Sequence, residues 1–187
     1  MAFSCITRNV FSVFPLLVFL SITPLSSSFS PSDKVTIGVL AQLCAKPPIY
    51  DHFCAGWLAP DPETFTLDIS GLVDLVLQKT QLFAYKNLAT MKGLVRTTSD
   101  PTLKAPYTTC VTGYESAIKA IEGAQTFATS KSYKLASQAA SKSFDSLSSC
   151  EAGLKGRRNV PAYVPQRNLL YGRMCTVDSV FSSFLSS

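Results

Sequence analysis

"CVTGYESAIKAIEGAQTFATSKSYKLASQAASKSFDSLSSC", the stretch from Cys110 to Cys150, contains two segments with the periodicity of an α-helix. Small and apolar residues recur at every third or fourth position in both segments, which is the pattern of a helix with one buried face. The polar run at 129–132 lies between the segments and indicates a turn. The stretch therefore predicts two antiparallel helices that pack against each other.

The cysteines at the two ends of this stretch are equally distant from the predicted turn. Ser130 lies twenty residues from Cys110 and twenty from Cys150. Residues at equal distances from the turn of an antiparallel hairpin lie side by side, and a disulfide requires Cα atoms within about 7 Å of each other. This spacing favours a Cys110–Cys150 disulfide.

A second cysteine pair surrounds a Pro-Pro step in "LCAKPPIYDHFCAGWL", at 43–58. The prolines predict a turn between two short helices, and the same argument from equal spacing pairs Cys44 with Cys54. Sequence alone allows about 15 arrangements of two disulfides among five cysteines. The spacing leaves Cys175 as a free thiol, which we expect to be buried as a small apolar residue.

Helical periodicity extends on both sides of the central hairpin, and the second helix of that hairpin is expected to continue unbroken to Leu154. Asp33 is the predicted cap of the first short helix, and the predicted core faces include Leu82 or Phe83, Phe144 and Leu170. The predicted fold class is all-α. It is an antiparallel, up-down-up-down four-helix bundle at about 66–187, preceded by a disulfide-stapled helical hairpin at about 33–60.

Residues 1–28 have the composition of a cleaved signal peptide. Arg8 supplies a positive charge, an apolar run extends over 10–22, and small residues follow it. The apolar run is too short to cross a bilayer. We therefore predict a single secreted domain at 29–187, with no attachment to a membrane after cleavage.

The charge balance excludes one class of partner and leaves another open. The chain has 17 Lys and Arg against 12 Asp and Glu, a formal net charge of +5. This charge is too small and too scattered for a nucleic-acid-binding protein. The basic loop that contains Arg157 and Arg158 is compatible with a solvated surface or with an acidic polysaccharide as ligand.

The sequence contains no recognisable catalytic or cofactor-binding constellation. Its one histidine, His52, has no nucleophile motif nearby, and no phosphate-binding, dinucleotide-binding or metalloprotease motif occurs. Cys44, His52 and Cys54 supply only three of the four ligands of a structural zinc site, and the secretory pathway oxidises thiols. We expect a binding protein that is not an enzyme and that has no metal and no cofactor.

These residues resemble the plant invertase and pectin methylesterase inhibitor family. The resemblance extends from about Thr36 to Leu185 and is most specific in the central hairpin. Family members have a cysteine followed by Tyr-x-x-Ala-Ile, a turn that ends in Tyr, a patch of small residues, and a second cysteine at the spacing seen here. The corresponding positions are Cys110, Tyr114, Ala117, Ile118, Tyr133, Ala140, Ser141 and Cys150.

The resemblance implies the same two disulfides, the same fold and a function. It implies a protein of the apoplast or cell wall that blocks the active-site cleft of a pectin methylesterase or of an acid invertase, without a covalent bond. Invertase inhibitors insert the loop between the second and third bundle helices, typically with a Pro-Lys-Phe motif, which "TSKSYK" lacks. The leading prediction is a pectin methylesterase inhibitor; the alternatives are an invertase inhibitor and a non-inhibitory cell-wall or pectin-binding member.

The predicted contact surface for the protein target lies on the outer face of the second and third bundle helices and at the turn between them. The resemblance implies this surface, because pectin methylesterase inhibitors present faces of their bundle helices to the cleft of the enzyme. The candidate residues are Thr112, Ser116, Lys119, Lys131, Tyr133, Gln138, Ser141 and Ser149.

Overall fold

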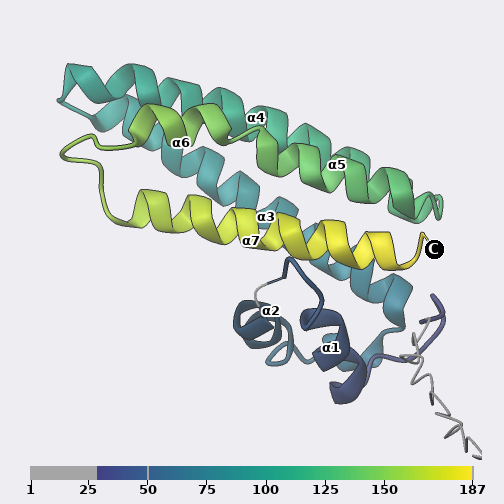
Figure 1. Cartoon of the computed structure of the whole chain (residues 1–187). Coiled ribbons are helices and arrows are strands. Elements are labelled where there is room, and N and C mark those ends of the chain that lie inside the picture. The colour runs from purple at the N-terminus through teal and green to yellow at the C-terminus, as the bar shows by residue number, and fades with distance from the viewer. Residues whose placement is uncertain (1–28, 50, 187) are drawn as a thin grey trace, which may run out of the picture.

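The computed structural model describes residues 29–49 and 51–186 (Figure 1). The signal peptide predicted at 1–28 lies outside these described residues. Two short helices come first, followed by one turn of 3-10 helix and then by the long helices of the bundle. The elements are α1 (Ile37–Cys44), α2 (Asp51–Leu58), η1 (Thr64–Thr66), α3 (Ile69–Thr97), α4 (Pro101–Thr129), α5 (Tyr133–Asp145), α6 (Ser148–Leu154) and α7 (Tyr163–Phe184).

The long helices form an antiparallel bundle around one core. Helix α3 packs on α4, α4 packs on both α5 and α6, α5 packs on α7, and α7 returns to α3. The hairpin of α1 and α2 lies outside this ring, with α2 against α7 (Figure 1). The all-α bundle with an N-terminal helical hairpin is thereby confirmed. In the described part of the chain, no helix combines the length and the apolar character needed to cross a bilayer.

Both predicted disulfides are present in the structure. Cys44 and Cys54 join α1 to α2, with their Cα atoms 5.5 Å apart. Cys110 and Cys150 join α4 to α6, with their Cα atoms 4.4 Å apart. The thiol of Cys175 on α7 is free and buried, and this burial raises its pKa above the ordinary value.

Aspartates cap the two longest helices. The carboxylate of Asp68 accepts a hydrogen bond from the backbone N–H of Gly71 at 2.8 Å, at the start of α3. The carboxylate of Asp100 accepts one from the N–H of Thr102 at 2.9 Å, and Pro101 occupies the first position of α4. The hydrogen bond from Gly71 lowers the pKa of Asp68, and the pKa of Asp100 is lowered first by the Thr102 hydroxyl, which donates to it at 2.7 Å, and then by the N–H of the same residue.

The predicted cap of α1 was wrong. The hydroxyl of Thr36 caps this helix by accepting from the N–H of Val39 at 3.2 Å. Asp33 instead accepts a hydrogen bond from the N–H of Ser30 at 2.7 Å. The helix begins later because residues 33–35 pair in extended conformation with the segment before α3, where the N–H of Val35 donates to a backbone carbonyl.

The prediction of one unbroken helix from Tyr133 to Leu154 was also wrong. The α-helical hydrogen-bond pattern is interrupted at Ser146 and Leu147, between α5 and α6, where the N–H of Leu147 donates to the carbonyl of Phe144 although both residues keep right-handed helical dihedrals. Helix α4 approaches this break closely, because a Cβ atom at Gly113 would lie 2.9 Å from the carbonyl oxygen of Ser146. The break and the glycine together allow the two backbones to come this near to each other.

Phe144 and Leu170 were predicted to face the core but are exposed, and of the alternatives Leu82 and Phe83 only Phe83 packs against the core. Leu82 is 60% exposed, Phe144 45% and Leu170 37%. Most of the predicted stripe on α3 and α7 is buried, but the buried faces of these helices also include small and polar residues that apolar periodicity does not mark. On α3 these residues are Thr80, Ala84 and Asn87, and on α7 they are Asn168, Cys175 and Asp178.

Asp178 is a fully buried carboxyl group in the middle of α7. Within the described part of the chain, neither of its oxygens makes a hydrogen bond, and the buried hydroxyls of Thr80 and Ser182 also make none. Burial raises the pKa of Asp178 well above its ordinary value, and the nearby Thr80 hydroxyl opposes this rise only in part. The carboxyl group therefore keeps its proton to a higher pH in the folded protein than in the unfolded chain.

We expect the substitution Gly113→Ala to destabilise the bundle and Gly172→Ala to be tolerated. At Gly113 the new methyl group would meet the backbone oxygen of Ser146, which cannot move alone, and this overpacking should cost about 1–3 kcal/mol. At Gly172 the new methyl group would lie 2.7 Å from the ring of Phe144, which is exposed and can rotate away. Unfolding in urea measures both changes, and equal losses would contradict the argument.

The substitution Asp178→Asn should change how stability depends on pH. The buried carboxyl of the folded state keeps its proton above about pH 4, whereas the unfolded chain releases it. The folded state then binds more protons, so the free energy of unfolding falls with rising pH by up to about 1.4 kcal/mol per pH unit. The amide that replaces the carboxyl group does not titrate, so the stability of the variant relative to the parent should rise with pH.

This comparison has an internal control. Asp145 is an exposed carboxyl group on α5, and Asp145→Asn removes the same charge from the surface. Its stability relative to the parent should stay nearly constant from about pH 4 to pH 7. If both variants show the same pH trend in urea unfolding, the trend comes from net charge and not from the burial of Asp178.

Candidate partner-binding surface

A chain of hydrogen bonds crosses the bundle core from α7 to α3, then to α4 and back to α7. The guanidinium Nε of Arg167 donates to Oδ1 of Asn87 at 2.6 Å, and Nδ2 of Asn87 donates to the Tyr114 hydroxyl at 3.0 Å. The Tyr114 hydroxyl donates to Oδ1 of Asn168 at 2.8 Å. Because a guanidinium can only donate, it fixes the direction of every bond that follows.

The direction of these hydrogen bonds determines the orientation of the Asn168 side-chain amide. Its oxygen is occupied by Tyr114, so its Nδ2 group faces the other way and lies 3.4 Å from Sγ of Cys150. Burial raises the pKa of Tyr114, which keeps the phenol protonated and able to donate. The amide orientation of a buried asparagine, which is 2% exposed, is thus set by an arginine on the preceding position of the same helix.

A second hydrogen-bonded cluster joins α4, α5 and α7. The hydroxyl of Ser143 donates to the carbonyl of Ala117 at 2.8 Å, which uses its only proton. The hydroxyl of Tyr171, 2.5 Å from Ser143, must therefore be the donor in that pair. Burial raises the pKa of Tyr171 and keeps it in this role. The two clusters hold the helices in one register, because each bond has one compatible arrangement.

The predicted contact residues of α4 share one exposed face. Thr112, Ser116 and Lys119 follow each other at intervals of four and three residues, and all three are exposed. Lys119 lines a shallow depression of about 290 Å³ between α3 and α4 together with Glu115 and Glu122. This edge of the face therefore carries charges of both signs.

The carboxylates at that edge are held by α3. Glu115 forms an ion pair with Lys92 at 2.8 Å, and Glu122 accepts a hydrogen bond from the Tyr85 hydroxyl at 2.7 Å. The latter bond raises the pKa of Tyr85. The acidic edge of the α4 face is consequently fixed in position rather than free to rearrange.

Three further predicted contact residues are exposed, but they do not all lie on the same face. Gln138 and Ser149 are exposed on α5 and α6. Ser141 is also exposed, but its hydroxyl lies 2.9 Å from that of Ser179 on α7. It therefore belongs to the seam between α5 and α7 and not to the face shared by α4 and α5.

Tyr133 does not belong to the surface, and its prediction as a contact residue was wrong. Its side chain is 7% exposed, because the first turn of α5 faces the core. Lys131 precedes it in the tight turn after α4, where it is exposed and has a positive φ of 58°. The turn thus presents one lysine to solvent and turns its tyrosine inward.

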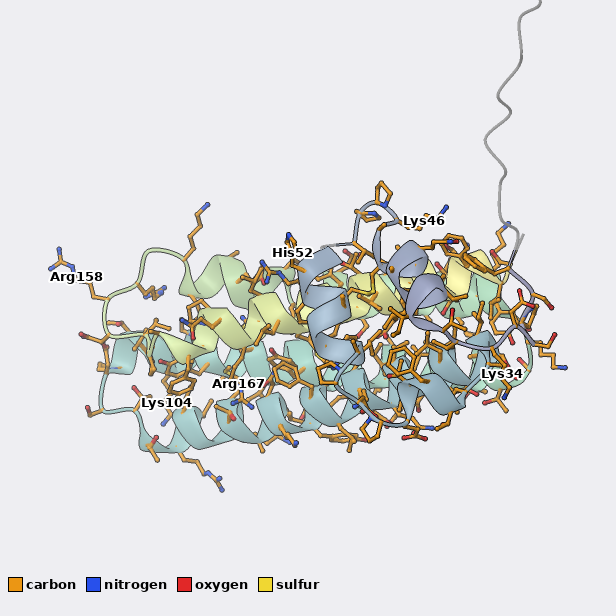
Figure 2. All side chains as sticks on the ribbon, turned by 90° about the horizontal axis from the view of Figure 1, so that it is seen from below. Lys34, Lys46, His52, Lys104, Arg158 and Arg167 are labelled. Carbon is orange, nitrogen blue, oxygen red and sulfur yellow. A yellow bond between two sulfur atoms is a disulfide. The ribbon has the colours of Figure 1, made fainter. Side chains whose placement is uncertain are left out.

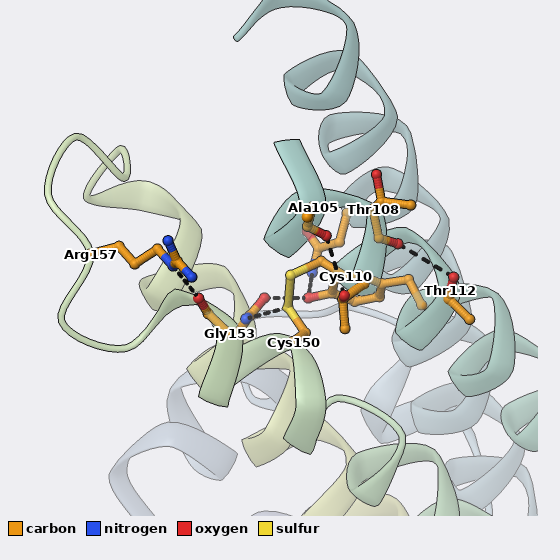
Figure 3. Close-up of a disulfide and its surroundings, with 11 residues drawn as sticks. Ala105, Thr108, Cys110, Thr112, Cys150, Gly153 and Arg157 are labelled. Atoms are coloured by element: carbon orange, nitrogen blue, oxygen red, sulfur yellow. Dashed lines mark hydrogen bonds between the residues drawn. A yellow bond between two sulfur atoms is a disulfide. The ribbon is translucent and has the colours of Figure 1, made fainter. Parts of the chain in front are cut away.

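Three residues of the hydrogen-bonded chain were not among the predicted functional residues. Arg167, Asn87 and Asn168 are polar side chains at core-facing helical positions, and this mismatch with the apolar pattern is a signal that could have found them. Arg157 was assigned to a basic loop, but its Nε donates to the carbonyl of Gly153 at 2.9 Å (Figure 3). In the described residues, His, Cys, Asp and Glu side chains form no group that could hold a metal ion.

Comparisons with known proteins agree with this architecture. The chain matches the family model described as plant invertase/pectin methylesterase inhibitor over residues 38–178. It is 32% identical over 185 residues to the pectinesterase inhibitor of Actinidia deliciosa, covering 99% of this chain and 98% of that protein. It is 24% identical to a putative invertase inhibitor of Platanus acerifolia, covering 83% of this chain and 88% of that protein.

A solved structure is similar as well. A mutant form of a pectin methylesterase inhibitor from Arabidopsis superposes with a TM-score of 0.66 at 25% sequence identity, covering 71% of this chain and 88% of that one. The members of the matching family are inhibitor proteins and not enzymes. The extent of the match and the shared bundle show that this chain belongs to the plant invertase/pectin methylesterase inhibitor family.

Proposed function

We propose that this protein is a secreted inhibitor of a pectin methylesterase, which it binds without a covalent bond through the outer face of α4, α5 and α6. The observation that carries the proposal is the match along nearly the whole chain to a protein named as a pectinesterase inhibitor. The residues proposed to contact the enzyme are those of the predicted set that the structure leaves on this face. They are Thr112, Ser116, Lys119, Gln138 and Ser149.

The rigidity of this face supports the proposal. The Cys110–Cys150 disulfide joins α4 to α6, and the Ser143 hydroxyl joins α5 to the backbone of α4. A surface that is already fixed before binding loses little conformational entropy in the complex, and this favours tight association. Polar and charged groups on such a surface contribute to the choice of partner.

Secretion is part of the same proposal. It rests on the signal peptide predicted at 1–28 and on the two disulfides, which form in oxidising compartments. The extracellular compartment of a plant also contains the pectin methylesterases that the inhibitor would meet, as the family resemblance implies.

An invertase target is the second candidate. It is favoured by the similarity to a putative invertase inhibitor of Platanus acerifolia. The turn that would enter an invertase consists of Ser130, Lys131 and Ser132 in this chain. It lacks the Pro-Lys-Phe motif that the family resemblance leads us to expect in invertase inhibitors, and this is why we place pectin methylesterase first.

An inhibition assay separates the two targets. We expect the purified protein to inhibit a plant pectin methylesterase and to leave an acid invertase active at the same concentration. The substitutions Ser116→Arg and Gln138→Arg place a bulky charge on the proposed face. They should each weaken the inhibition at least about tenfold, which corresponds to about 1.4 kcal/mol.

The matched control for these variants is Ala89→Arg. Ala89 is exposed on α3, which lies diagonally across the bundle from α5, and the same side chain should have no effect there. Inhibition of the invertase alone, weakened by Lys131→Glu, would replace the first candidate with the second. A protein that inhibits neither enzyme would contradict both and would leave a non-inhibitory, pectin-binding member of the family.

A further inference from the structure

A groove lies beside α6, and none of the residues proposed to contact the enzyme lines it. It has a volume of about 660 Å³ and is bounded by α6, by the loop that follows α6 and by the first turns of α7. This volume is within the range of small-molecule sites in proteins. Leu154, Val160 and Pro165 form its apolar lining.

Two cations line the same groove, and the structure holds one of them in place. Lys155 and Arg157 both contribute to the wall. Nη1 of Arg157 donates to the carbonyl of Thr102 at 3.1 Å, and its Nε donates to the carbonyl of Gly153 (Figure 3). These bonds occupy two of the five N–H groups of the guanidinium and leave the others for a ligand.

The sequence explains why both carbonyls are open to Arg157. In a regular helix the carbonyl of Thr102 would accept from the N–H of residue 106, but that residue is Pro106 and has no N–H. The carbonyl of Gly153 is in the last turn of α6, where helical partners end. The guanidinium is thus fixed by two acceptors that the helices cannot satisfy themselves.

The groove also contains neutral and acidic hydrogen-bonding groups. Asn168 lies at the base of the groove, where it is 2% exposed and its Nδ2 group already contacts Sγ of Cys150, so the groups open to a ligand lie on the wall. Glu151 and the hydroxyl of Ser148 lie on the same wall. A ligand that fits this set has a carboxylate for the two cations, hydroxyl groups for Glu151 and Ser148, and an apolar face for the lining.

We propose that this groove binds a uronate residue of an acidic polysaccharide. A uronate sugar carries one carboxylate, several hydroxyl groups and a ring face of C–H groups, and so combines the three properties. A simple carboxylate has no hydroxyl group to donate to Glu151, and a neutral sugar has no charge to form a charge-assisted hydrogen bond with Lys155 or Arg157. Opposite charge on wall and ligand adds a long-range attraction.

Other cations of the same end of the molecule lie outside the groove. Arg158 and Lys104 project from this end of the bundle, while Lys34 and Lys46 lie toward the other end (Figure 2). Arg158 follows Arg157 directly in the chain and is exposed. It provides a control that removes an identical charge one residue away from the site.

Calorimetric titration of the purified protein with a short galacturonate oligomer tests the proposal. Arg157→Gln should weaken binding at least tenfold, whereas Arg158→Gln should change it less than threefold. Ala152→Trp should also weaken it at least tenfold, because Ala152 is an exposed groove residue of α6 and its replacement fills the groove without changing a charge. Circular dichroism and urea unfolding verify that each variant is folded.

Several outcomes would overturn the proposal. The first is that the oligomer does not bind. The second is that Arg157→Gln and Arg158→Gln weaken its binding equally while Ala152→Trp does not weaken it. The third is that an acidic peptide or a neutral galactose oligomer binds with the same affinity as the galacturonate oligomer. The second result would indicate a diffuse charge effect, and the third would remove the requirement for a uronate. The titration contains no enzyme, so its failure leaves the proposed inhibition untouched, and a failed inhibition assay leaves the groove untouched.

Discussion

The contact between α4 and the α5–α6 segment is the constraint on which the rest of the structure depends. The Cys110–Cys150 disulfide sets the distance at one point, and Gly113 allows the backbone at Ser146 to come close three residues further along α4. The break between α5 and α6 lies at this approach. Because α6 is thereby fixed on α4, both the outer face of these helices and the groove beside α6 have a defined shape.

The polar groups in the core have a different role from the apolar ones. Apolar side chains such as Leu72 and Phe181 supply the burial that stabilises the bundle but would tolerate small shifts of a helix. The chain from Arg167 through Asn87 and Tyr114 would not, because each of its hydrogen bonds has one donor, one acceptor and one direction. An inhibitor needs a surface of constant shape, and these bonds supply the constancy.

The sequence predicted the helical class, the order of the helices and the cysteine pairing, because these depend on spacing along the chain. It did not predict the break after Asp145, because this depends on how closely the α5–α6 segment can approach α4. Periodicity also placed Phe144 in the core, although it is exposed. Small and polar residues give a weak apolar pattern, so the direction of a helix face is known only once its neighbours are in place.

Helix α6 links the two proposed binding functions without making them compete. It is a helix of seven residues, and Cys150 ties it to α4. Ser149 faces the proposed enzyme surface, while Ala152 faces the groove. A rigid helix that presents different residues to two ligands allows each to bind while the other is present, provided that neither ligand reaches around the helix. A uronate in the groove could therefore hold the inhibitor on the polysaccharide on which its target enzyme acts, and that would raise the local concentration of the inhibitor near the enzyme.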